Sequence, residues 1–197
     1  TGGGYHYYYA QAALISVDVN PSIELTVNRL DRDTTGLLIV AKNALSSCIL
    51  SDMVRNRQIH RTYLAAVSGN LSGQPEGTID VPIARLPGST IERVPDPVHG
   101  EAALTHYELL FYQPQTDTSL LKIHLETGRT HQIRVHLAYI GHPILGDTVY
   151  GAKKPVPGLQ GQCLHAVGLR FLHPRTGELV ELWCDLPEAF QTQLRKL

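Results

Sequence analysis

The stretch Asn28-Arg29-Leu30-Asp31-Arg32-Asp33-Thr34-Thr35-Gly36-Leu37-Leu38-Ile39-Val40-Ala41-Lys42 joins a highly charged loop directly to an apolar run. The apolar part, residues 37–42, is short and follows Thr-Thr-Gly, a pattern that predicts a buried strand. A loop beside a buried strand holds its side chains rigidly at the rim of a sheet, as a catalytic carboxylate requires. Ordinary turn chemistry is the alternative, since Asp and Thr stabilise turns and Gly36 supplies a positive φ.

The rest of the chain shows short strand-like runs with helices interspersed at irregular intervals. We expect strands at residues 61–67, 103–110, 120–126, 164–172 and 179–183, and helices at residues 45–57, 130–139 and after residue 187. This order favours the α+β class, with a mixed, largely antiparallel β-sheet and flanking helices and loops.

Two parts of the chain are less regular. Residues 68–99 are rich in turn-forming residues and predict hairpin turns and a long loop. Residues 1–28 indicate only a short helix or strand that ends near Val19. In the first predicted helix, the spacing of Leu45, Ile49 and Met53 predicts that these side chains form its apolar face.

Length and composition suit one globular domain. The chain has 197 residues, of which 43% are hydrophobic and 18% charged, and these values exclude collagen-like, coiled-coil and highly charged disordered classes. No run approaches the roughly 18 apolar residues of a membrane span, and no secretory leader is visible. The three cysteines form no close pair, which is typical of a reducing compartment. We therefore expect a monomer in the cytoplasm or an organelle matrix, not a secreted protein.

The distribution of charge says more than its sum, because the formal net charge is only -1. Residues 29–61 hold six basic side chains against three acidic ones, whereas residues 76–108 hold two basic against six acidic. A polyanion is therefore expected to favour the first region and to avoid the second.

A second charged segment, residues 127–136, joins a predicted strand to a predicted helix. Its helix begins with amides that can receive an anion, flanked by Arg129. Arg134 lies about 100° from the apolar stripe, at its edge, where an arginine usually needs an anionic partner. An ordinary structural ion pair would satisfy that requirement equally well.

Two further residues allow both a functional and a structural interpretation. Tyr63 projects from a predicted strand beside basic residues and could stack on a nucleobase, although most strand tyrosines simply pack. Asp147 lies in the Gly-rich segment 141–151 and is expected to cap a turn rather than to act in catalysis.

The ten histidines raise the question of a metal site, but their spacing argues against one. His131 and His136 lie about 140° apart around a helix, so they cannot chelate one ion together. Cys163 and His165 lack a second ligand pair at zinc-finger spacing. No G-x-S-x-G motif occurs, and the helical spacing places Cys48 within an apolar face, so no nucleophilic triad is indicated.

Four segments in this order resemble the RNA pseudouridine synthases of the RluA type, which act on large-subunit ribosomal RNA and transfer RNA. They are residues 29–38, Tyr63 in its strand, residues 127–136 and residues 141–147, and the resemblance covers roughly residues 28–197. It implies the pseudouridine synthase catalytic fold, with an active-site cleft at the centre of the sheet. We expect one catalytic domain over residues 1–197, truncated at the N-terminus, because the family's usual first strand and Lys-Pro-x-Gly turn are absent.

The resemblance also implies roles for individual residues. Asp31 corresponds to the essential aspartate, Tyr63 to the active-site tyrosine and Arg134 to the arginine that pairs with the aspartate. Arg29 corresponds to the position that enters the RNA stack where the target uridine leaves. Asn28 stands where the family usually has His, and Thr35 stands where it usually has Ser, next to the catalytic group.

The implied reaction breaks the bond from ribose to N1 of uracil, turns the base and rejoins it through C5. The change is redox-neutral, so we expect no cofactor, nucleotide or metal. A carboxylate can attack the nucleoside or stabilise the cation-like sugar, and the sequence leaves both routes open. Burial disfavours a charged carboxylate, and a guanidinium at contact distance opposes that effect, which gives Arg134 a chemical task.

The target atoms are inaccessible in a stacked helix, so the uridine must flip out of the structured RNA. Basic side chains near Asp31 are expected to contact the RNA and to make its affinity salt-dependent. These expected contacts are Arg29, Arg32, Arg55, Arg57, Arg61, Arg129 and His131.

Three hypotheses about function remain open at this point. The first is an RNA pseudouridine synthase that depends on Asp31. The second is an RNA-binding or RNA-folding protein on the same fold that no longer turns over. The third is a glycoside- or nucleoside-cleaving hydrolase that uses Asp31 with Asp33 or Glu126.

Overall fold

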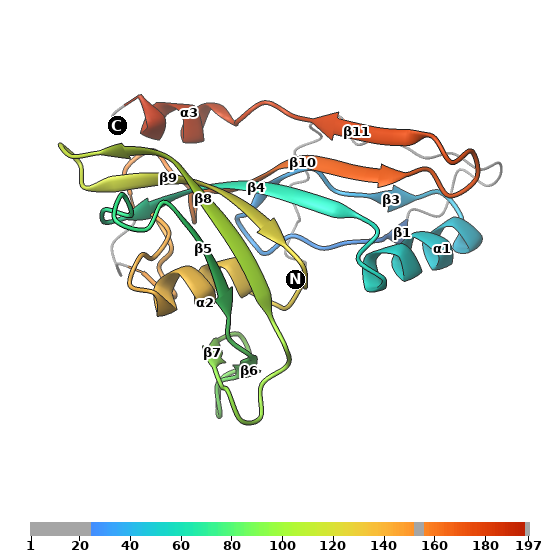
Figure 1. The fold of residues 1–197 in the computed structure, drawn as a ribbon, viewed down its shortest axis with the longest axis horizontal. Coiled ribbons are helices and arrows are strands. Elements are labelled where there is room, and N and C mark those ends of the chain that lie inside the picture. The colour runs from blue at the N-terminus through green and yellow to red at the C-terminus, as the bar shows by residue number, and fades with distance from the viewer. Residues whose placement is uncertain (1–24, 152–155, 196–197) are drawn as a thin grey trace, which may run out of the picture.

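The structure is a computed structural model that describes residues 25–151 and 156–195. The short element expected before residue 19 lies outside the described residues. The main sheet has seven strands, which neighbour one another as follows (Figure 1): β11 (Leu179–Trp183), β10 (Leu164–Leu172), β4 (His60–Ser68), β9 (Thr118–Leu125), β8 (Leu104–Gln113) and β5 (Glu76–Asp80), with β2 (Thr35–Gly36) also paired to β10. Only β2 runs parallel to its partner. The predicted mixed, largely antiparallel sheet is therefore confirmed.

Two pairs of short strands stand apart from this sheet. β1 (Leu25–Thr26) pairs with β3 (Val40–Ala41) beside α1 (Ala44–Arg55). β6 (Ile83–Arg85) and β7 (Arg93–Pro95) form a hairpin at the end of a projection that Figure 1 shows below the sheet.

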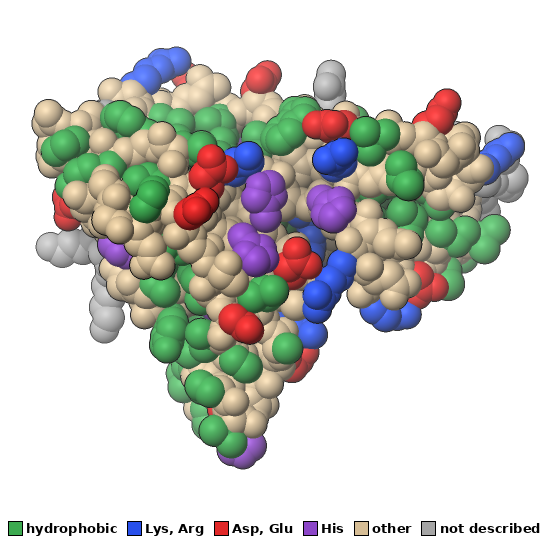
Figure 2. Space-filling model, in the orientation of Figure 1, with side chains coloured by type: hydrophobic (Ala, Val, Ile, Leu, Met, Phe, Trp, Pro, Cys, Tyr) green, Lys and Arg blue, Asp and Glu red, His purple; other side chains and the backbone are tan. Residues whose placement is uncertain are grey.

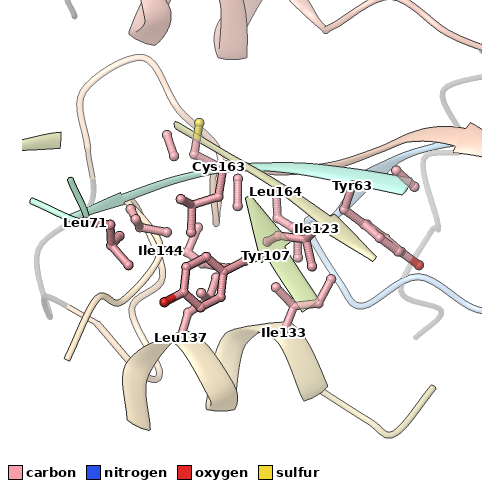
Figure 3. Close-up of a cluster of buried hydrophobic side chains, with 14 of the residues drawn as sticks. Tyr63, Leu71, Tyr107, Ile123, Ile133, Leu137, Ile144, Cys163 and Leu164 are labelled. Atoms are coloured by element: carbon pink, nitrogen blue, oxygen red, sulfur yellow. The ribbon is translucent and has the colours of Figure 1, made fainter. Parts of the chain in front are cut away.

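A large apolar cluster joins the sheet to α2 (Gln132–Tyr139) and α3 (Glu188–Leu194). Figure 3 shows Ile133 and Leu137 extending from α2 toward the strands, where Tyr63 and Leu164 belong to the same cluster. Gly141 follows the helix with φ +84°, which confirms the predicted helix stop. α2 therefore has a fixed position under β4, and the side chains at its N-terminal end are fixed with it.

The apolar run after the charged loop is only partly a strand, so that prediction needs correction. Residues 37–39 lie outside the ladder, and only Val40–Ala41 pair, with β1. Leu37 and Ile39 are nevertheless buried, each 2% exposed. The run is hydrophobic because it crosses the second apolar cluster between β2 and β3, and burial alone does not require ladder pairing.

The predicted apolar face of α1 was wrong for Leu45 and Ile49 and right for Met53. Leu45 is 67% exposed and Ile49 is 39% exposed, whereas Ser46 and Leu50 are buried together with Met53. Cys48, expected on the apolar face, is exposed as well. Both sets of residues satisfy helical spacing, and the contacts of α1 with β1 and β3 decide which one is covered.

Residues 68–99 were predicted to hold hairpin turns and a long loop. The hairpin is present as β6 and β7, but β5, which forms the edge of the main sheet on β8, was not predicted. The turn-forming residues that surround β5 hide its strand pattern. The other predicted strands, at residues 61–67, 103–110, 120–126, 164–172 and 179–183, are confirmed within a few residues.

One buried histidine makes the stability of this fold depend on pH. His165 on β10 is 2% exposed, and burial lowers its pKa to about 4. The unfolded chain then binds more protons between pH 6.5 and 4, so stability is lost as pH falls through this window. We expect this group to remove about 3 kcal/mol of the unfolding free energy between these pH values.

His165→Gln is therefore expected to flatten the pH dependence of the unfolding free energy, measured by urea denaturation between pH 7 and pH 4. His99→Gln is the matched control because the His99 side chain is 83% exposed, and it should follow the unaltered chain. A His165→Gln slope equal to that of the control would contradict the assignment.

Candidate active site

The charged loop before β2 is held by hydrogen bonds from inside and from outside. Within it, the amide of Thr34 donates to the carbonyl of Asp31 at 3.0 Å and closes a turn. Buried Gln162 donates its side-chain amide to the carbonyl of Arg32 at 2.8 Å and to Thr34 Oγ1 at 2.7 Å. These contacts fix the backbone that carries the Asp31 side chain.

The loop ends against β10 at a position where only glycine fits. Gly36 has φ +116°, and a Cβ there would lie 2.2 Å from the carbonyl oxygen of Ala166. Thr35, beside it, shares a hydrogen bond of 2.7 Å with His165 Nδ1. At the other end, Asn28 Oδ1 accepts the amide of Ile39 at 2.8 Å. Asn28 and Thr35 therefore hold the two ends of the loop.

Asp31 meets Arg134, which a second carboxylate holds from behind. Arg134 Nη1 lies 3.7 Å from Asp31 Oδ2. The same guanidinium donates through Nε and Nη2 to both carboxylate oxygens of Asp147, at 2.7 and 2.9 Å. The side chains of Asp31, Arg134 and Asp147 are 16%, 6% and 0% exposed. Arg134 is thus a buried cation shared by two carboxylates.

The ionisation of this buried pair follows from its contacts. Burial works to raise the pKa of Asp147, but the hydrogen bonds and positive charge of Arg134 outweigh it and lower that pKa. Burial likewise opposes the charged form of Arg134, yet Asp147 and then Asp31 raise its pKa above the ordinary value. Both groups therefore stay charged.

Asp147 has two functions in the structure, and the sequence indicated only one. It accepts the amides of Val149 and Tyr150, at 3.0 and 3.1 Å, as a turn cap does. Its pairing with Arg134 was missed, although Arg134 had been expected to need an anionic partner. The position of Arg134 on its helix indicated that it needs an anionic partner. The partner itself, Asp147, lies on a separate loop that the helical pattern does not identify.

Tyr63 and Arg61 lie side by side on β4 at the floor of the site. They are 4% and 9% exposed. Burial raises the pKa of Tyr63, Arg61 opposes this, and the negative charge of Asp31 adds to it. Arg61 Nη2 donates to the carbonyl of Thr127 at 3.4 Å, and the Arg61 side chain also hydrogen-bonds Tyr63, whereas its Nε has no partner among the described residues. Arg61 is therefore a buried cation without a carboxylate partner in the part of the chain that the structure describes.

A cleft of about 550 Å³ lies over the centre of the sheet, and neither Arg134 nor Asp147 is among its lining residues. Its volume is within the usual range for small-ligand sites. Asp31 and Tyr63 both line it, and five of the predicted RNA contacts do so as well: Arg29, Arg55, Arg57, Arg61 and Arg129. Figure 2 shows basic side chains, in blue, along the hollow between the lobe with α1 and the lower projection. Side chains from three separate segments thus converge on one positively charged cleft.

Two of the predicted RNA contacts do not line the cleft. Arg32 has an 89% exposed side chain that pairs with Asp33 at 3.2 Å, because the turn directs it into solvent. His131 precedes α2 with φ +59°, and its Nδ1 shares a hydrogen bond of 2.8 Å with the Tyr150 hydroxyl. The anion site expected at the start of α2 is also altered, because the Arg129 amide donates to Gln132 Oε1 at 2.9 Å.

Two negative findings concern the residues that the structure describes. Within residues 25–151 and 156–195, no group of three or more His, Cys, Asp or Glu side chains is arranged to hold a metal ion. None of the helices in the same ranges is both long enough and apolar enough to span a membrane.

The comparison with known proteins agrees with this fold. A family model described as RNA pseudouridylate synthase matches residues 15–139. The Uncharacterized RNA pseudouridine synthase YjbO of Bacillus subtilis is 44% identical over 162 residues, which are 82% of this chain and 55% of the relative. Ribosomal large subunit pseudouridine synthase D of Haemophilus influenzae is 40% identical over 185 residues, with 87% of this chain and 55% of the relative covered.

Two solved structures have the same fold. Human RNA Pseudouridylate Synthase Domain Containing 1 superposes with a TM-score of 0.70 and 28% identity, covering 83% of this chain and 69% of that one. Human RNA Pseudouridylate Synthase Domain Containing 4 has a TM-score of 0.72 and 25% identity, with coverages of 88% and 75%. The chain belongs to the RNA pseudouridylate synthase family, which confirms the resemblance seen in the sequence. It spans about half the length of the curated relatives that it matches.

Replacing Asp147 with Asn is expected to lower the free energy of unfolding by about 3 kcal/mol, because it leaves Arg134 buried with one incomplete partner. Urea denaturation measures this loss. Asp52→Asn is the matched control: Asp52 is half-exposed, pairs with Arg55 at 2.6 Å, and should cost less than about 1 kcal/mol. Equal losses in the two variants would contradict a stabilising role for the buried pair.

Proposed function

We propose that this chain carries the catalytic centre of an RNA pseudouridine synthase, which converts specific uridines in structured RNA to pseudouridine. The observation that carries this function is that Asp31 lines a nucleotide-sized cleft and contacts the buried guanidinium of Arg134, which lies outside the cleft lining. The membership of the chain in the RNA pseudouridylate synthase family supports the same reaction class. We take residues 1–197 as one catalytic domain, and the curated relatives are longer than this chain.

Asp31 is the catalytic carboxylate of this proposal. Its side chain is 16% exposed, enough to meet a substrate at the cleft surface while most of its surroundings are protein. Arg134 stabilises its charged form, and Asp147 prevents Arg134 from rotating away, because two hydrogen bonds hold the guanidinium. A charged carboxylate in a fixed orientation can attack the nucleoside or stabilise a cation-like sugar as the bond to N1 breaks.

Tyr63 holds the detached uracil and assists a proton transfer in this mechanism. Its ring lines the cleft from the central strand, where it can stack on a base while the base turns. Because burial raises the pKa of Tyr63, its hydroxyl keeps its proton and can donate a hydrogen bond near Asp31. The adjacent cation of Arg61 would stabilise negative charge that develops on the base or the phenol.

The uridine reaches this site by flipping out of the RNA. Arg29 is exposed on the same loop as Asp31 and lines the cleft, so it can fill the space that the base leaves. Arg55, Arg57 and Arg129 lie around the rim and would contact phosphates, which makes the affinity depend on salt. Relatives named as large-subunit synthases make ribosomal RNA the first substrate to test.

The hydrolase hypothesis has less support from the geometry. Asp33 does not line the cleft, and its carboxylate pairs with Arg32 instead. Glu126 does line the cleft, but it pairs with Arg57 at 3.7 Å. Neither residue is held in place by buried partners as Asp31 is. Release of free uracil from RNA would nevertheless favour a hydrolase over a synthase.

Asp31→Asn is expected to abolish formation of pseudouridine while leaving RNA affinity nearly unchanged, since phosphate contacts dominate that affinity. The measurement is release of the C5 hydrogen from tritiated uridine in an unmodified transcript of large-subunit ribosomal RNA. Asp33→Asn is the matched control, because it removes the same charge from the same loop at a positive φ that Asn tolerates. Asp33→Asn should keep its activity.

Unimpaired turnover by Asp31→Asn would contradict the proposed mechanism. An unaltered protein that binds the RNA tightly but releases no C5 hydrogen from any uridine would favour the RNA-binding hypothesis instead.

Tyr63→Phe is expected to keep base stacking and RNA affinity but to lower kcat by about 10²–10⁴-fold, the range typical of lost proton transfer. Single-turnover kinetics on the same transcript measure this effect. Tyr107→Phe serves as the control, since Tyr107 is also buried in the core but does not line the cleft. If both variants turn over alike, the Tyr63 hydroxyl has no part in the chemistry.

A further inference from the structure

A second, smaller cleft adjoins the first and is lined by three arginines. Its volume is about 230 Å³, and Arg85, Arg93 and Arg129 line it together with Glu101. Gly128, Arg129 and Thr130 line both clefts, so the two adjoin each other. Arg85 and Arg93 come from the β6–β7 hairpin, which belongs to the lower projection in Figure 1. None of the RNA contacts expected from the sequence lies on this hairpin.

The charges in this second cleft do not cancel. Glu101 pairs with Arg129, which leaves Arg85 and Arg93 as excess positive charge. Arg93 Nη1 donates to the carbonyls of Ile91 and Glu92, both at 3.1 Å, and these are uncharged partners. Arg85 is exposed and has no ion pair among the described residues. The cleft can therefore accept an anion.

The positions of the two arginines on the hairpin also place like charges next to each other. Arg85 and Arg93 are direct partners across the antiparallel hairpin, and like charges directly opposite each other destabilise a strand pair. A bound anion between them would remove that repulsion. An arrangement that costs stability in the free protein and favours an anion in the complex is typical of a binding site.

The hairpin has a fixed connection to the candidate active site through Tyr150. The backbone amide of Arg93 donates to the Tyr150 hydroxyl at 2.8 Å, and that hydroxyl also contacts His131 Nδ1 at 2.8 Å. The guanidinium of Arg134 lies over the Tyr150 ring, 5.1 Å from its centre. One aromatic side chain therefore sets the position of the hairpin relative to the arginine that meets Asp31.

We propose, on the basis of the function proposed above, that this second cleft binds a backbone phosphate of the substrate RNA beside the flipped uridine. Arg85 and Arg93 bind the phosphodiester. Tyr150 fixes the hairpin that carries both arginines, so the bound phosphate lies at a constant distance from Asp31. The site thus selects RNA whose strand continues past the target nucleotide along the hairpin. The sequence had predicted that a polyanion avoids residues 76–108. The proposed site places RNA against this segment instead, because both of its basic residues, Arg85 and Arg93, line the cleft.

Arg85→Gln is the variant that tests this site, because the Arg85 side chain makes no hydrogen bond to the hairpin within the described residues. RNA affinity is measured by fluorescence anisotropy with the unmodified ribosomal transcript between 50 and 200 mM salt. Loss of one phosphate contact should weaken binding and reduce the slope of log affinity against log salt by about 0.7–0.9. KM for conversion should rise, with kcat unchanged. Arg175→Gln removes the same charge from the exposed β10–β11 turn and should change neither quantity.

The outcomes separate this site from the catalytic proposal. If the protein converts uridine but Arg85→Gln binds RNA as Arg175→Gln does, the phosphate site is wrong and the synthase function stands. If no uridine is converted yet Arg85→Gln alone lowers the salt slope, the phosphate site stands and the synthase function fails. Absence of any RNA binding by the unaltered protein would overturn both.

Discussion

The arrangement of the candidate site depends on one buried guanidinium. Arg134 offers its nitrogens in a rigid planar fork, two of them bonded to Asp147 and the third facing Asp31. Asp147 neutralises the charge of Arg134 and fixes the orientation of its guanidinium. The Asp31 carboxylate therefore contacts a cation in a constant position. The position of α2, set by the apolar packing of Ile133 and Leu137, therefore decides the electrostatic environment of a carboxylate on a distant loop.

Around this pair, the cleft is organised to favour negative charge. Arg61 is buried at its floor with no carboxylate partner among the described residues, a state that costs stability until an anion arrives. The exposed arginines at the rim and the opposed pair on the β6–β7 hairpin extend the same sign of charge outward. A nearly neutral chain can thus present a strongly basic cleft, because its acidic side chains lie elsewhere or are already paired.

Regular secondary structure was predictable where its pattern is long. β4, β8, β9 and β10 are each eight to ten residues long, enough to be recognised. β11 was recognised from the turn that precedes it, and α2 is followed by a glycine with positive φ. The prediction of the buried helix face failed where two different sets of side chains fit the same helical spacing. Leu45 and Leu50 both fit the apolar spacing of α1, and only the neighbouring strands decide that Leu50 is buried. β6 and β7 are three residues each, too short for alternation to be visible.

The sequence alone predicted three features: the charged loop with Asp31, the strand with Tyr63 and the helix with Arg134. It also predicted that Arg134 needs an anionic partner. These are properties of neighbouring residues, and local spacing is sufficient to express them. The partnership with Asp147, the support from Gln162 and the basic hairpin joined through Tyr150 were decided only by the tertiary structure. Each joins side chains far apart in the chain, and their meeting depends on how the sheet, α2 and the loops pack, which no local pattern encodes.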